Sequence, residues 1–402
     1  MSHALARART LRVRDRYILL GAVALLYVTC IPFSNGDMRA HLVPWTRYLL
    51  DHGRFAALAD NFSEYSPPYL YLLSLASRAE ATIGVVAVIK LVAIAGTLLL
   101  AGAITTMLGS CQRRAGDTRC VATCGGVVML CLPTVIANGP VWGQCDALYT
   151  AFTLLAIAAF VRGHAALAMA AVGMALAFKL QAIFIAPLVL AMLLAGRARW
   201  WMLTIPPAVY ATAMLPAWIA GRPARDLALL YIAQGQYFHD LARSVPNVWQ
   251  ILRALVTIPY ELGVAIGLAA AAAATVTLAW RARRHLDDPA NLLLTALAGA
   301  ILVPYLLPKM HNRYFFMADV LALAYAFIRP SARTFRIVVL TQIGSLLAYA
   351  TFLLHLTGGA FVGAFFMSGA LVLVLREVRG RMPRIPRARA HLAGSCPQFI
   401  SE

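Results

Sequence analysis

The sequence predicts an all-α, polytopic membrane protein with about twelve transmembrane helices and an interfacial helix in its first outer loop, on three observations. Of the 402 residues, 61% are hydrophobic and 13% are charged, whereas about 25% of residues are charged in a soluble domain. The apolar residues form long runs, and lipid admits helices because every backbone polar group must be bonded internally. Short clusters of arginine separate the runs, which is the orientation signal of membrane proteins.

The net charge of +19 does not indicate a nucleic-acid partner, because the basic residues stand between apolar runs rather than in one patch. We expect a single membrane domain over residues 1–402, with cytoplasmic basic tails at 1–16 and 376–402, in the cell inner membrane. The seven cysteines lack the spacing of a zinc site. No disulfide framework, metal ion or other cofactor is therefore expected.

The first predicted span, residues 17–33, is about long enough to cross a bilayer. Asp37 stands in the outer loop that follows it. The next residues predict an amphipathic helix on the membrane surface, bent at Pro44 and ended at Gly53. Asp37 is then either the N-cap of this helix or an acid kept at the lipid–water boundary for a function.

Residues 69–77 are apolar but only about half as long as a span, and we interpret them as a re-entrant or tilted half-helix. The next span, residues 83–108, requires this interpretation because Arg113 and Arg114 mark its end as cytoplasmic. Lys90 lies within that span and is expected to face the helix bundle rather than lipid.

From there the predicted spans alternate in direction. They are residues 121–137, 147–161, 165–178, 182–195, 202–219, 260–280, 291–306, 314–328, 337–354 and 360–374. This alternation gathers five polar segments on the outer face, which are Asp37, the turn 142–146, Lys179 with Gln181, the loop 221–249, and residues 309–313.

Residues 309–313 contain the densest cationic group predicted for the outer face, Lys309, His311 and Arg313. Positive charge there opposes the usual orientation bias, and three potential cations near apolar surface suit a phosphate anchored in the bilayer. The alternative is a basic loop in contact with water. Asp319, in the following span, either pairs with Arg313 or is a buried structural acid.

Gln144 and Asp146 can point along the membrane surface from the turn 142–146, and Lys179 and Gln181 interrupt a long apolar run at an interface. Ordinary interfacial turns are the alternative. The loop 221–249 mixes aromatic and polar residues, which suits sugar rings but also an interfacial belt. These residues are Tyr231, Tyr237, Phe238, Trp249, Gln234, Gln236, His239 and Asn247.

One acid, several cations and apolar surroundings at a membrane face suggest the transfer of a sugar from a lipid phosphate. Asp37 would accept the proton of an acceptor hydroxyl as general base, and the cations would stabilise the leaving phosphate. A single base predicts inversion, because retention needs a close carboxylate pair. No Asp-x-Asp motif is present, since Met38 and Arg39 follow Asp37, which favours a metal-independent reaction.

Five motifs, in order along the chain, resemble those of the GT-C superfamily of polyprenyl- or dolichyl-phosphate-sugar-dependent glycosyltransferases. Gly36-Asp37, followed by His41 and Trp45, is similar to the first-loop motif of the dolichyl-phosphate-glucose-dependent enzymes. The resemblance implies that Asp37 is the catalytic base. Tyr-Ser-Pro-Pro-Tyr, beginning at Tyr65, resembles the Tyr-Pro-Pro segment of those enzymes.

Trp-Gly-Gln-Cys-Asp at 142–146 and Phe-Lys-Leu-Gln at 178–181 look like segments of bacterial relatives. Lys-Met-His-Asn-Arg-Tyr-Phe at 309–315 resembles the His-Glu-Arg-Tyr motif that holds the donor phosphate. Asn312 replaces the Glu of that motif, so the role of the Glu does not carry over. The resemblance implies a bacterial enzyme that uses polyprenyl-phosphate mannose or glucose.

We therefore expect a hexosyltransferase with a polyprenyl-phosphate hexose as donor and a lipid-linked glycan or other outer-face molecule as acceptor. The expected catalytic residue is Asp37, the phosphate ligands are Lys309, His311 and Arg313, and the substrate-binding residues are His41, Tyr65, Trp142, Gln144, Asp146, Lys179 and Gln181. A transporter or lipid flippase is the main alternative and would bring its charges to the bilayer midplane. A non-catalytic assembly partner is a third possibility.

Overall fold

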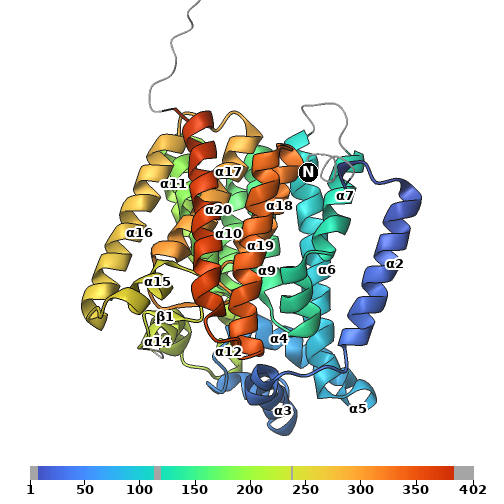
Figure 1. Cartoon of the computed structure of the whole chain (residues 1–402). Coiled ribbons are helices and arrows are strands. Elements are labelled where there is room, and N and C mark those ends of the chain that lie inside the picture. The colour runs from blue at the N-terminus through green and yellow to red at the C-terminus, as the bar shows by residue number, and fades with distance from the viewer. Residues whose placement is uncertain (1–7, 113–118, 237–238, 384–402) are drawn as a thin grey trace, which may run out of the picture.

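The computed structural model describes residues 8–112, 119–236 and 239–383, and it is a bundle of helices that run between two ends (Figure 1). The start of α2 and the end of α20 lie at the upper end in Figure 1, whereas α3, α4 and α5 lie at the lower end. The strands of the described chain are β1 (Ala242–Arg243) and β2 (Met310–His311), which pair in parallel. The all-α class predicted from the sequence is confirmed.

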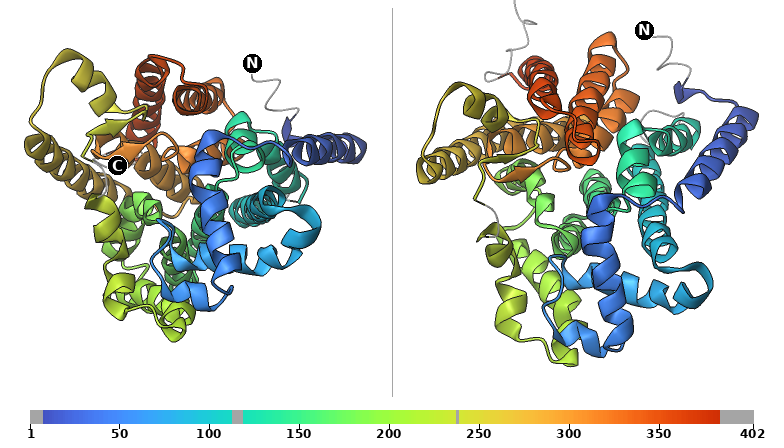
Figure 2. Two further views of the ribbon diagram at one scale, coloured as in Figure 1. Left: turned by 90° about the horizontal axis from the view of Figure 1, so that it is seen from below. Right: turned by 60° about the horizontal axis from the view of Figure 1, so that its bottom comes forward.

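The N-terminal part of the chain forms two long helices and a group of short ones between them. The long helices are α2 (Val13–Cys30) and α6 (Val85–Gln112). Between them lie a π-helix (Met38–Leu42), α3 (Val43–Asp51), a 3₁₀ turn (Ala56–Ala59), α4 (Pro67–Ala76), a second 3₁₀ turn (Ser77–Ala79) and α5 (Glu80–Ile83). Figure 2 shows α3 lying across the lower face of the bundle.

The middle of the chain alternates between the two ends. Its elements are α7 (Arg119–Leu130), α8 (Pro133–Ile136), a π-helix (Ala137–Val141), α9 (Asp146–Val161), α10 (Ala165–Phe178), a 3₁₀ segment (Leu180–Ile185), α11 (Ala186–Leu194), a 3₁₀ turn (Trp200–Thr204) and α12 (Ile205–Ala220).

The C-terminal part begins with short elements and continues with long helices. The short elements are α13 (Ala224–Ala228), α14 (Leu230–Gln236), β1 and α15 (Val248–Leu255). The long helices are α16 (Tyr260–Ala282), α17 (Pro289–Leu306), α18 (Phe316–Ile328), α19 (Ala332–Leu353) and α20 (Gly359–Arg381).

Each of the predicted spans coincides with one of these helices or with a consecutive pair. Within the described residues, six helices are long and apolar enough to cross a bilayer, or seven if the bent pair Cys120–Leu130 and Pro133–Val141 is one span. Four other apolar helices are shorter, between 10 and 17 residues. The chain is thus a multi-pass membrane protein, while the count of about twelve crossings stays a prediction.

The half-helix predicted at 69–77 corresponds to α4, whose 10 residues span about 15 Å, half of the hydrocarbon core of about 30 Å. The helix α6 starts at the same lower end (Figure 1), so α4 does not cross. Its Pro67, Tyr69 and Leu73 are buried within the protein. Burial in protein is the condition under which such a short segment is tolerated at membrane depth.

The predicted amphipathic helix after Asp37 is also present, as the π-helix and α3. Leu42 and Leu49, on the predicted apolar side of this helix, are buried. Arg39 and Arg47, on the predicted polar side, are exposed. Pro44 occupies the first turn of α3, where its missing N–H costs little. Gly53 ends the segment with a φ of 79°, a conformation that favours glycine.

Two boundaries differ from the sequence prediction. The helix α2 begins at Val13, so part of the predicted tail 1–16 belongs to the first helix. The helix α20 extends to Arg381, where Arg381 Nη2 donates to Asp288 Oδ2 at 2.6 Å. The last turn of α20 is thus joined to the residue before α17 by an ion pair.

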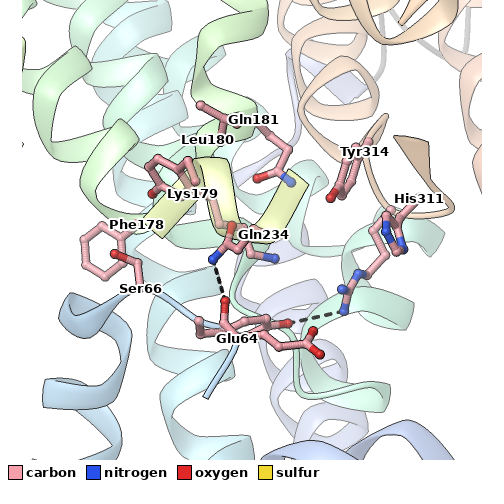
Figure 3. A pocket seen from close by; sticks show the side chains of 12 residues that line it. Glu64, Ser66, Phe178, Lys179, Leu180, Gln181, Gln234, His311 and Tyr314 are labelled. Carbon is pink, nitrogen blue, oxygen red and sulfur yellow. Dashed lines mark hydrogen bonds between the residues drawn. The ribbon is translucent and has the colours of Figure 1, made fainter. Parts of the chain in front are cut away.

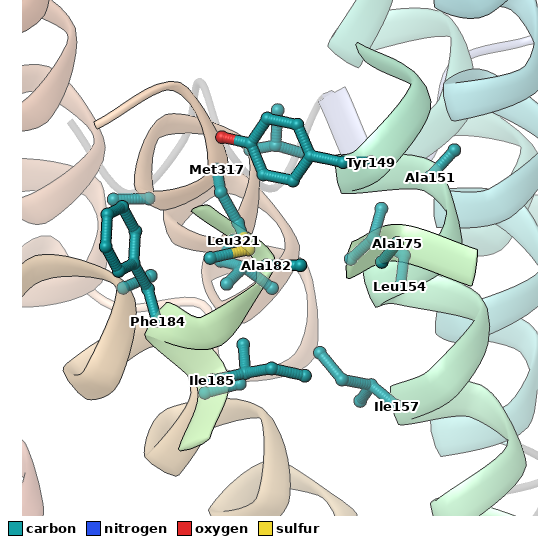
Figure 4. Close-up of a cluster of buried hydrophobic side chains, with 14 of the residues drawn as sticks. Tyr149, Ala151, Leu154, Ile157, Ala175, Ala182, Phe184, Ile185, Met317 and Leu321 are labelled. Atoms are coloured by element: carbon teal, nitrogen blue, oxygen red, sulfur yellow. The ribbon is translucent and has the colours of Figure 1, made fainter. Parts of the chain in front are cut away.

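Buried apolar side chains fill the bundle directly behind the lower-end loops. Figure 4 shows one cluster in which α9, α10, the 3₁₀ segment after it and α18 meet. Its members include Tyr149, Leu154, Ile157, Ala175, Ala182, Phe184, Ile185, Met317 and Leu321, each at most 2% exposed. This packing fixes the positions of the helix ends that carry the polar residues described next.

Candidate active site

The helix after the first span is capped by Asn35 rather than by Asp37. Asn35 Oδ1 accepts a hydrogen bond from the backbone N–H of Met38 at 2.9 Å, and its carbonyl accepts from the N–H of Arg39 at 3.1 Å. Asp37 already has helical φ and ψ angles, and its side chain makes no capping bond. The interpretation of Asp37 as an N-cap is therefore wrong, and its carboxylate is available for another role.

Two neutral donors from a distant turn hold the Asp37 carboxylate. Its Oδ2 accepts from Trp142 Nε1 at 2.8 Å and from Gln144 Nε2 at 3.0 Å, while Oδ1 lies 4.0 Å from His41 Nε2. The side chain is 16% exposed. Trp142 is itself wedged against Phe352, with ring centroids 5.3 Å apart. Asp37 is thus oriented by uncharged hydrogen bonds and keeps access to solvent.

The turn that supplies these donors depends on Gly143. This residue has a φ of 80°, and a Cβ atom there would lie 2.5 Å from the Cε of Met38. Lys90 supports the same turn, because its buried ammonium donates to the carbonyls of Pro140, at 2.7 Å, and Val141. Lys90 faces the bundle, as its place inside a span predicted.

Tyr65 and Arg313 link the Asp37 turn to the opposite wall of the site. Tyr65 Oη donates to Gln144 Oε1 and accepts from Arg313 Nη1 at 3.3 Å. Burial raises the pKa of Tyr65 to about 12, so the hydroxyl keeps its proton. The Arg313 guanidinium lies over the Trp142 ring, 5.1 Å from its centroid. The contact between Tyr65 and Arg313 joins residues that are 248 positions apart.

Asp146 has a more strongly charged environment than Asp37. Its Oδ1 lies 2.6 Å from Lys179 Nζ, and its Oδ2 accepts from Asn138 Nδ2 at 2.7 Å and lies 4.0 Å from Arg313 Nε. Lys179 is in extended conformation where α10 ends, which turns its side chain inward. Burial alone would lower the pKa of Lys179, but the carboxylate of Asp146 raises it. Lys179 therefore stays cationic.

The three predicted phosphate ligands do not come together in one place. His311 and Arg313 line the same cavities, whereas Lys309 donates to the carbonyl of Gly235 at 2.7 Å and lies over the Tyr260 ring. Lys309 adopts a φ of 62°, and this backbone turn directs its side chain away from Arg313. The candidate site therefore contains His311 and Arg313 without Lys309.

His311 is not a cation in the unliganded protein. Burial and the nearby positive charges of Arg313 and Arg243 lower its pKa to about 3. The pairing of β1 with β2 places Arg243 in register with His311. Arg243 thus brings a positive charge beside His311 from a distant loop, and the imidazole is neutral near pH 7.

Two cavities meet at Tyr65 and Arg313. The first, of about 110 Å³, is shown in Figure 3 and is bordered by Lys179, Gln181 and Tyr314. The second, of about 200 Å³, is bordered by Asp37, His41, Trp45, Trp142, Gln144 and Arg243. Both cavities include Glu64, Tyr65, His311 and Arg313. Asp146 lies behind this shared wall with its side chain 3% exposed.

Several residues of the cavities were not among the predicted site residues. Glu64 lines both cavities, and its carboxylate makes no hydrogen bond or ion pair with another described residue. Glu64 directly precedes Tyr65 in the sequence, and its position next to a predicted site residue could have identified it. Arg243 gave no such signal, because a strand of two residues has no recognisable period.

The loop 221–249 contributes in two ways. Tyr231 and Gln234 line the first cavity, where Gln234 Nε2 donates to the carbonyl of Glu64 at 2.5 Å. Trp249 and Asn247 instead donate to carbonyls at the end of α17, at 2.7 Å and 3.2 Å. Two of the aromatic residues predicted for this loop, Tyr237 and Phe238, lie outside the described residues.

Asp319 is not part of this site. Its side chain is fully buried within α18, and Ser345 Oγ donates to its Oδ1 at 3.1 Å. No described pairing joins it to Arg313, so the alternative of a buried structural acid holds. The described residues also include no group of three or more His, Cys, Asp or Glu side chains placed to hold a metal ion.

The sequence matches no protein-family model and no curated protein. The fold, however, resembles two crystal structures of ArnT from Cupriavidus metallidurans, one described as bound to undecaprenyl phosphate and one in the apo state. The bound structure superposes with a TM-score of 0.54 at 14% identity, over 91% of this chain and 75% of that one. The apo structure gives 0.53 at 14% identity, over 92% and 77%. At this identity the likeness shows that the present chain and ArnT share a fold.

Proposed function

We propose that this protein is a membrane glycosyltransferase that moves a hexose, mannose or glucose, from polyprenyl phosphate to an acceptor hydroxyl. The observation that carries the proposal is the shared wall of the two cavities. Asp37, held by neutral donors, borders one cavity, and Lys179 borders the other. Tyr65 and Arg313 line both cavities and lie between them. In this proposal, the base and the phosphate ligands are on the two sides of one reaction centre.

The proposed reaction is a single displacement. The oxygen of the acceptor hydroxyl attacks the anomeric carbon, and the bond from that carbon to the phosphate oxygen breaks with its electron pair on the phosphate. Asp37 accepts the hydroxyl proton. Its hydrogen bonds from Trp142 and Gln144 orient the carboxylate without pairing it to a cation. Attack from the face opposite the phosphate inverts the anomeric centre.

The leaving phosphate would be stabilised in the first cavity. Lys179 and Arg313 supply fixed positive charges there, in surroundings where charge-assisted hydrogen bonds are strong. His311 contributes a neutral N–H donor in the free protein, and an arriving phosphate would favour its protonation. Lys309 is left out of this phosphate site because its ammonium binds the carbonyl of Gly235. These side chains supply the positive charge that the step needs without a metal ion.

The second cavity would hold the hexose and the acceptor hydroxyl. His41, Trp45 and Trp142 offer ring faces, and Gln144 offers an amide, beside Asp37. This combination suits the apolar faces and hydroxyls of a sugar. The likeness to ArnT supports the donor class, since one of its structures is described as bound to undecaprenyl phosphate. The topology predicted from the arginines puts this end of the bundle on the periplasmic side of the inner membrane.

The test is a transfer assay with purified protein, synthetic polyprenyl-phosphate mannose or glucose, and a hydroxyl acceptor extracted from membranes. Formation of glycosylated acceptor together with free polyprenyl phosphate is expected, and chelating agents should leave the rate nearly unchanged. Movement of intact donor across proteoliposomes without cleavage of the sugar–phosphate bond would instead establish a flippase. Activity that is lost with chelator and restored by manganese would contradict the metal-independent step.

A further inference from the structure

The upper end of the bundle, opposite the candidate active site, carries an apolar groove. Its volume is about 470 Å³, and it lies between α6, α9, α10 and α12. Small side chains make its floor, namely Ala158 and Ala159 of α9 and Ala170 of α10. Leu167 at its edge is 62% exposed. The groove is therefore open along the side of the bundle that meets lipid.

Close packing beside the groove explains why it stays open. A Cβ atom on Gly173 of α10 would lie 2.8 Å from the Cα of Pro206 and 2.9 Å from the Cβ of Val209. The two helices are thus in direct contact at this level, with Val209 and Met174 forming one wall. The alanines on the other side are too small to fill the remaining space.

Positive charge gathers where the groove reaches the upper end. Arg162 and His164 border the groove, and an adjoining cavity of about 650 Å³ shares His164 and adds Arg197 and Arg199. Asp287 neutralises Arg197. Among the described residues, no carboxylate forms an ion pair with Arg162 or Arg199. Ser110 accepts from Arg162 Nε at 2.9 Å, which holds this guanidinium at the mouth of the groove.

The length of the groove matches one leaflet of a bilayer. Phe152 and Arg162 border it at its two ends along α9, and ten residues of helix rise about 15 Å. Half of the hydrocarbon core is also about 15 Å. An acyl chain in the groove would therefore place its headgroup beside Arg162 and Arg199.

We propose that this groove binds an anionic phospholipid, with an acyl chain between α9, α10 and α12 and its phosphate on Arg162 and Arg199. The apolar floor accounts for the acyl chain. The two arginines, which form no ion pair with a described carboxylate, account for the negative headgroup. The proposal is independent of glycosyl transfer. Lipid binding would also affect the candidate active site. The helix α9 begins with Asp146 at the lower end, and α10 ends there at Phe178, directly before Lys179. A lipid that joins these two helices would help to keep that ion pair aligned.

The experiment is native mass spectrometry of the full-length protein, titrated with phosphatidylglycerol and with phosphatidylethanolamine of identical chains. Wild type is expected to bind the anionic lipid about tenfold more tightly or better, since each arginine near a headgroup contributes about a factor of five. Arg162→Gln/Arg199→Gln should abolish this preference. Ala159→Leu should fill the groove and weaken binding of both lipids while the charges are kept.

The matched control is Arg284→Gln/Arg336→Gln, which removes two exposed arginines at the same end that border neither cavity. It should leave the preference intact. Arg162 and Arg199 are themselves exposed, so their double variant should fold even if Ala159→Leu does not. Equal binding of the two lipids by wild type, or equal loss in the control, would overturn the proposal. Glycerol 1-phosphate competing as well as intact lipid would also overturn it, in favour of a soluble phosphate site.

Discussion

Asp37 and Asp146 are two of the carboxylates at the lower end of the bundle, and they differ in the groups that contact them. Asp37 receives hydrogen bonds from an indole and an amide and is 16% exposed, whereas Asp146 contacts Lys179 and Arg313 and is 3% exposed. A carboxylate paired with buried cations is a poor base because protonation would leave those cations uncompensated. Asp37 is therefore suited to accept a proton, and Asp146 to hold cations in place.

The largest expected difference between Asp37 and Asp146 is in the effect of their substitution on turnover. Asp37→Asn should lower kcat by roughly 10²–10⁴-fold, the usual effect of losing a general base. Its stability should be near wild type, because the Asn oxygen can still accept from Trp142 and Gln144. Rates and thermal unfolding of the purified protein check both expectations. Asp51→Asn, an exposed acid at the end of α3, is the matched control. Near-normal turnover in Asp37→Asn would remove Asp37 as the base.

Asp146→Asn should show the opposite pattern, with a loss of stability. The change leaves Lys179 buried without its counter-ion, which costs about 3–5 kcal/mol. The apparent Tm in detergent should therefore fall well below that of Asp37→Asn. Asp146→Asn/Lys179→Met removes both charges and should recover much of the loss. If the double variant is less stable than Asp146→Asn, the pair is not the unit that the contacts indicate.

Arg313→Lys sharpens the comparison, since Arg313 contacts both regions. The lysine keeps the positive charge, but it lacks the planar guanidinium, whose several N–H donors can bind Tyr65 and the phosphate at the same time. Losing one charge-assisted hydrogen bond should reduce kcat/KM for the donor by about tenfold or more. The readout is donor kinetics at saturating acceptor. Unchanged donor kinetics would show that Arg313 only supports the wall.

His311 should make the protein more sensitive to acid. Its pKa in the folded protein is about 3, below the ordinary value of about 6.5, so the unfolded chain binds the proton first as the pH falls. Stability is fully present above about pH 6.5 and declines towards pH 3, by at most about 1.4 kcal/mol per pH unit. His311→Gln should flatten this part of the profile of Tm against pH. An identical profile in the variant would show that other groups cause the decline.

The smallest expected effect is that of Lys309→Gln. Lys309 lies outside both cavities and binds a backbone carbonyl, so donor kinetics should change by less than about threefold, as for other substitutions away from a functional contact. The comparison with Arg313→Lys is made in the same donor titration. A loss as large as that of Arg313→Lys would mean that Lys309 turns into the site when donor binds.

The sequence predicted the fold class, the half-helix and the convergence of distant polar segments. The length of each apolar run indicates whether a helix can span the membrane, and the arginines indicate on which side each span ends. The sequence also placed Lys90 correctly, since a lysine inside a span must find partners in the bundle. Asp37 and the turn 142–146 gather at the lower end for this reason, as the hydrogen bonds of Asp37 demonstrate.

Finer features depended on single backbone angles and tertiary contacts. The N-cap moved to Asn35, since Asn and Asp two positions apart are equivalent in local sequence. Lys309 points away from Arg313 because of one positive φ angle, which no side-chain pattern reports. Arg243 reached the site through a pairing of two-residue strands.

The separation between Tyr65 and Arg313 also sets when the site can exist during synthesis. The two residues are 248 positions apart, and at about 5–20 residues per second a ribosome needs roughly 12–50 s to cover that distance. Asp37 is in the nascent chain throughout this interval, and Asp146 is added within it, well before Arg313 is made. A chain that stops at the end of α17, at Leu306, would contain most of its helices and still lack Arg313, so the candidate site is completed late in biosynthesis.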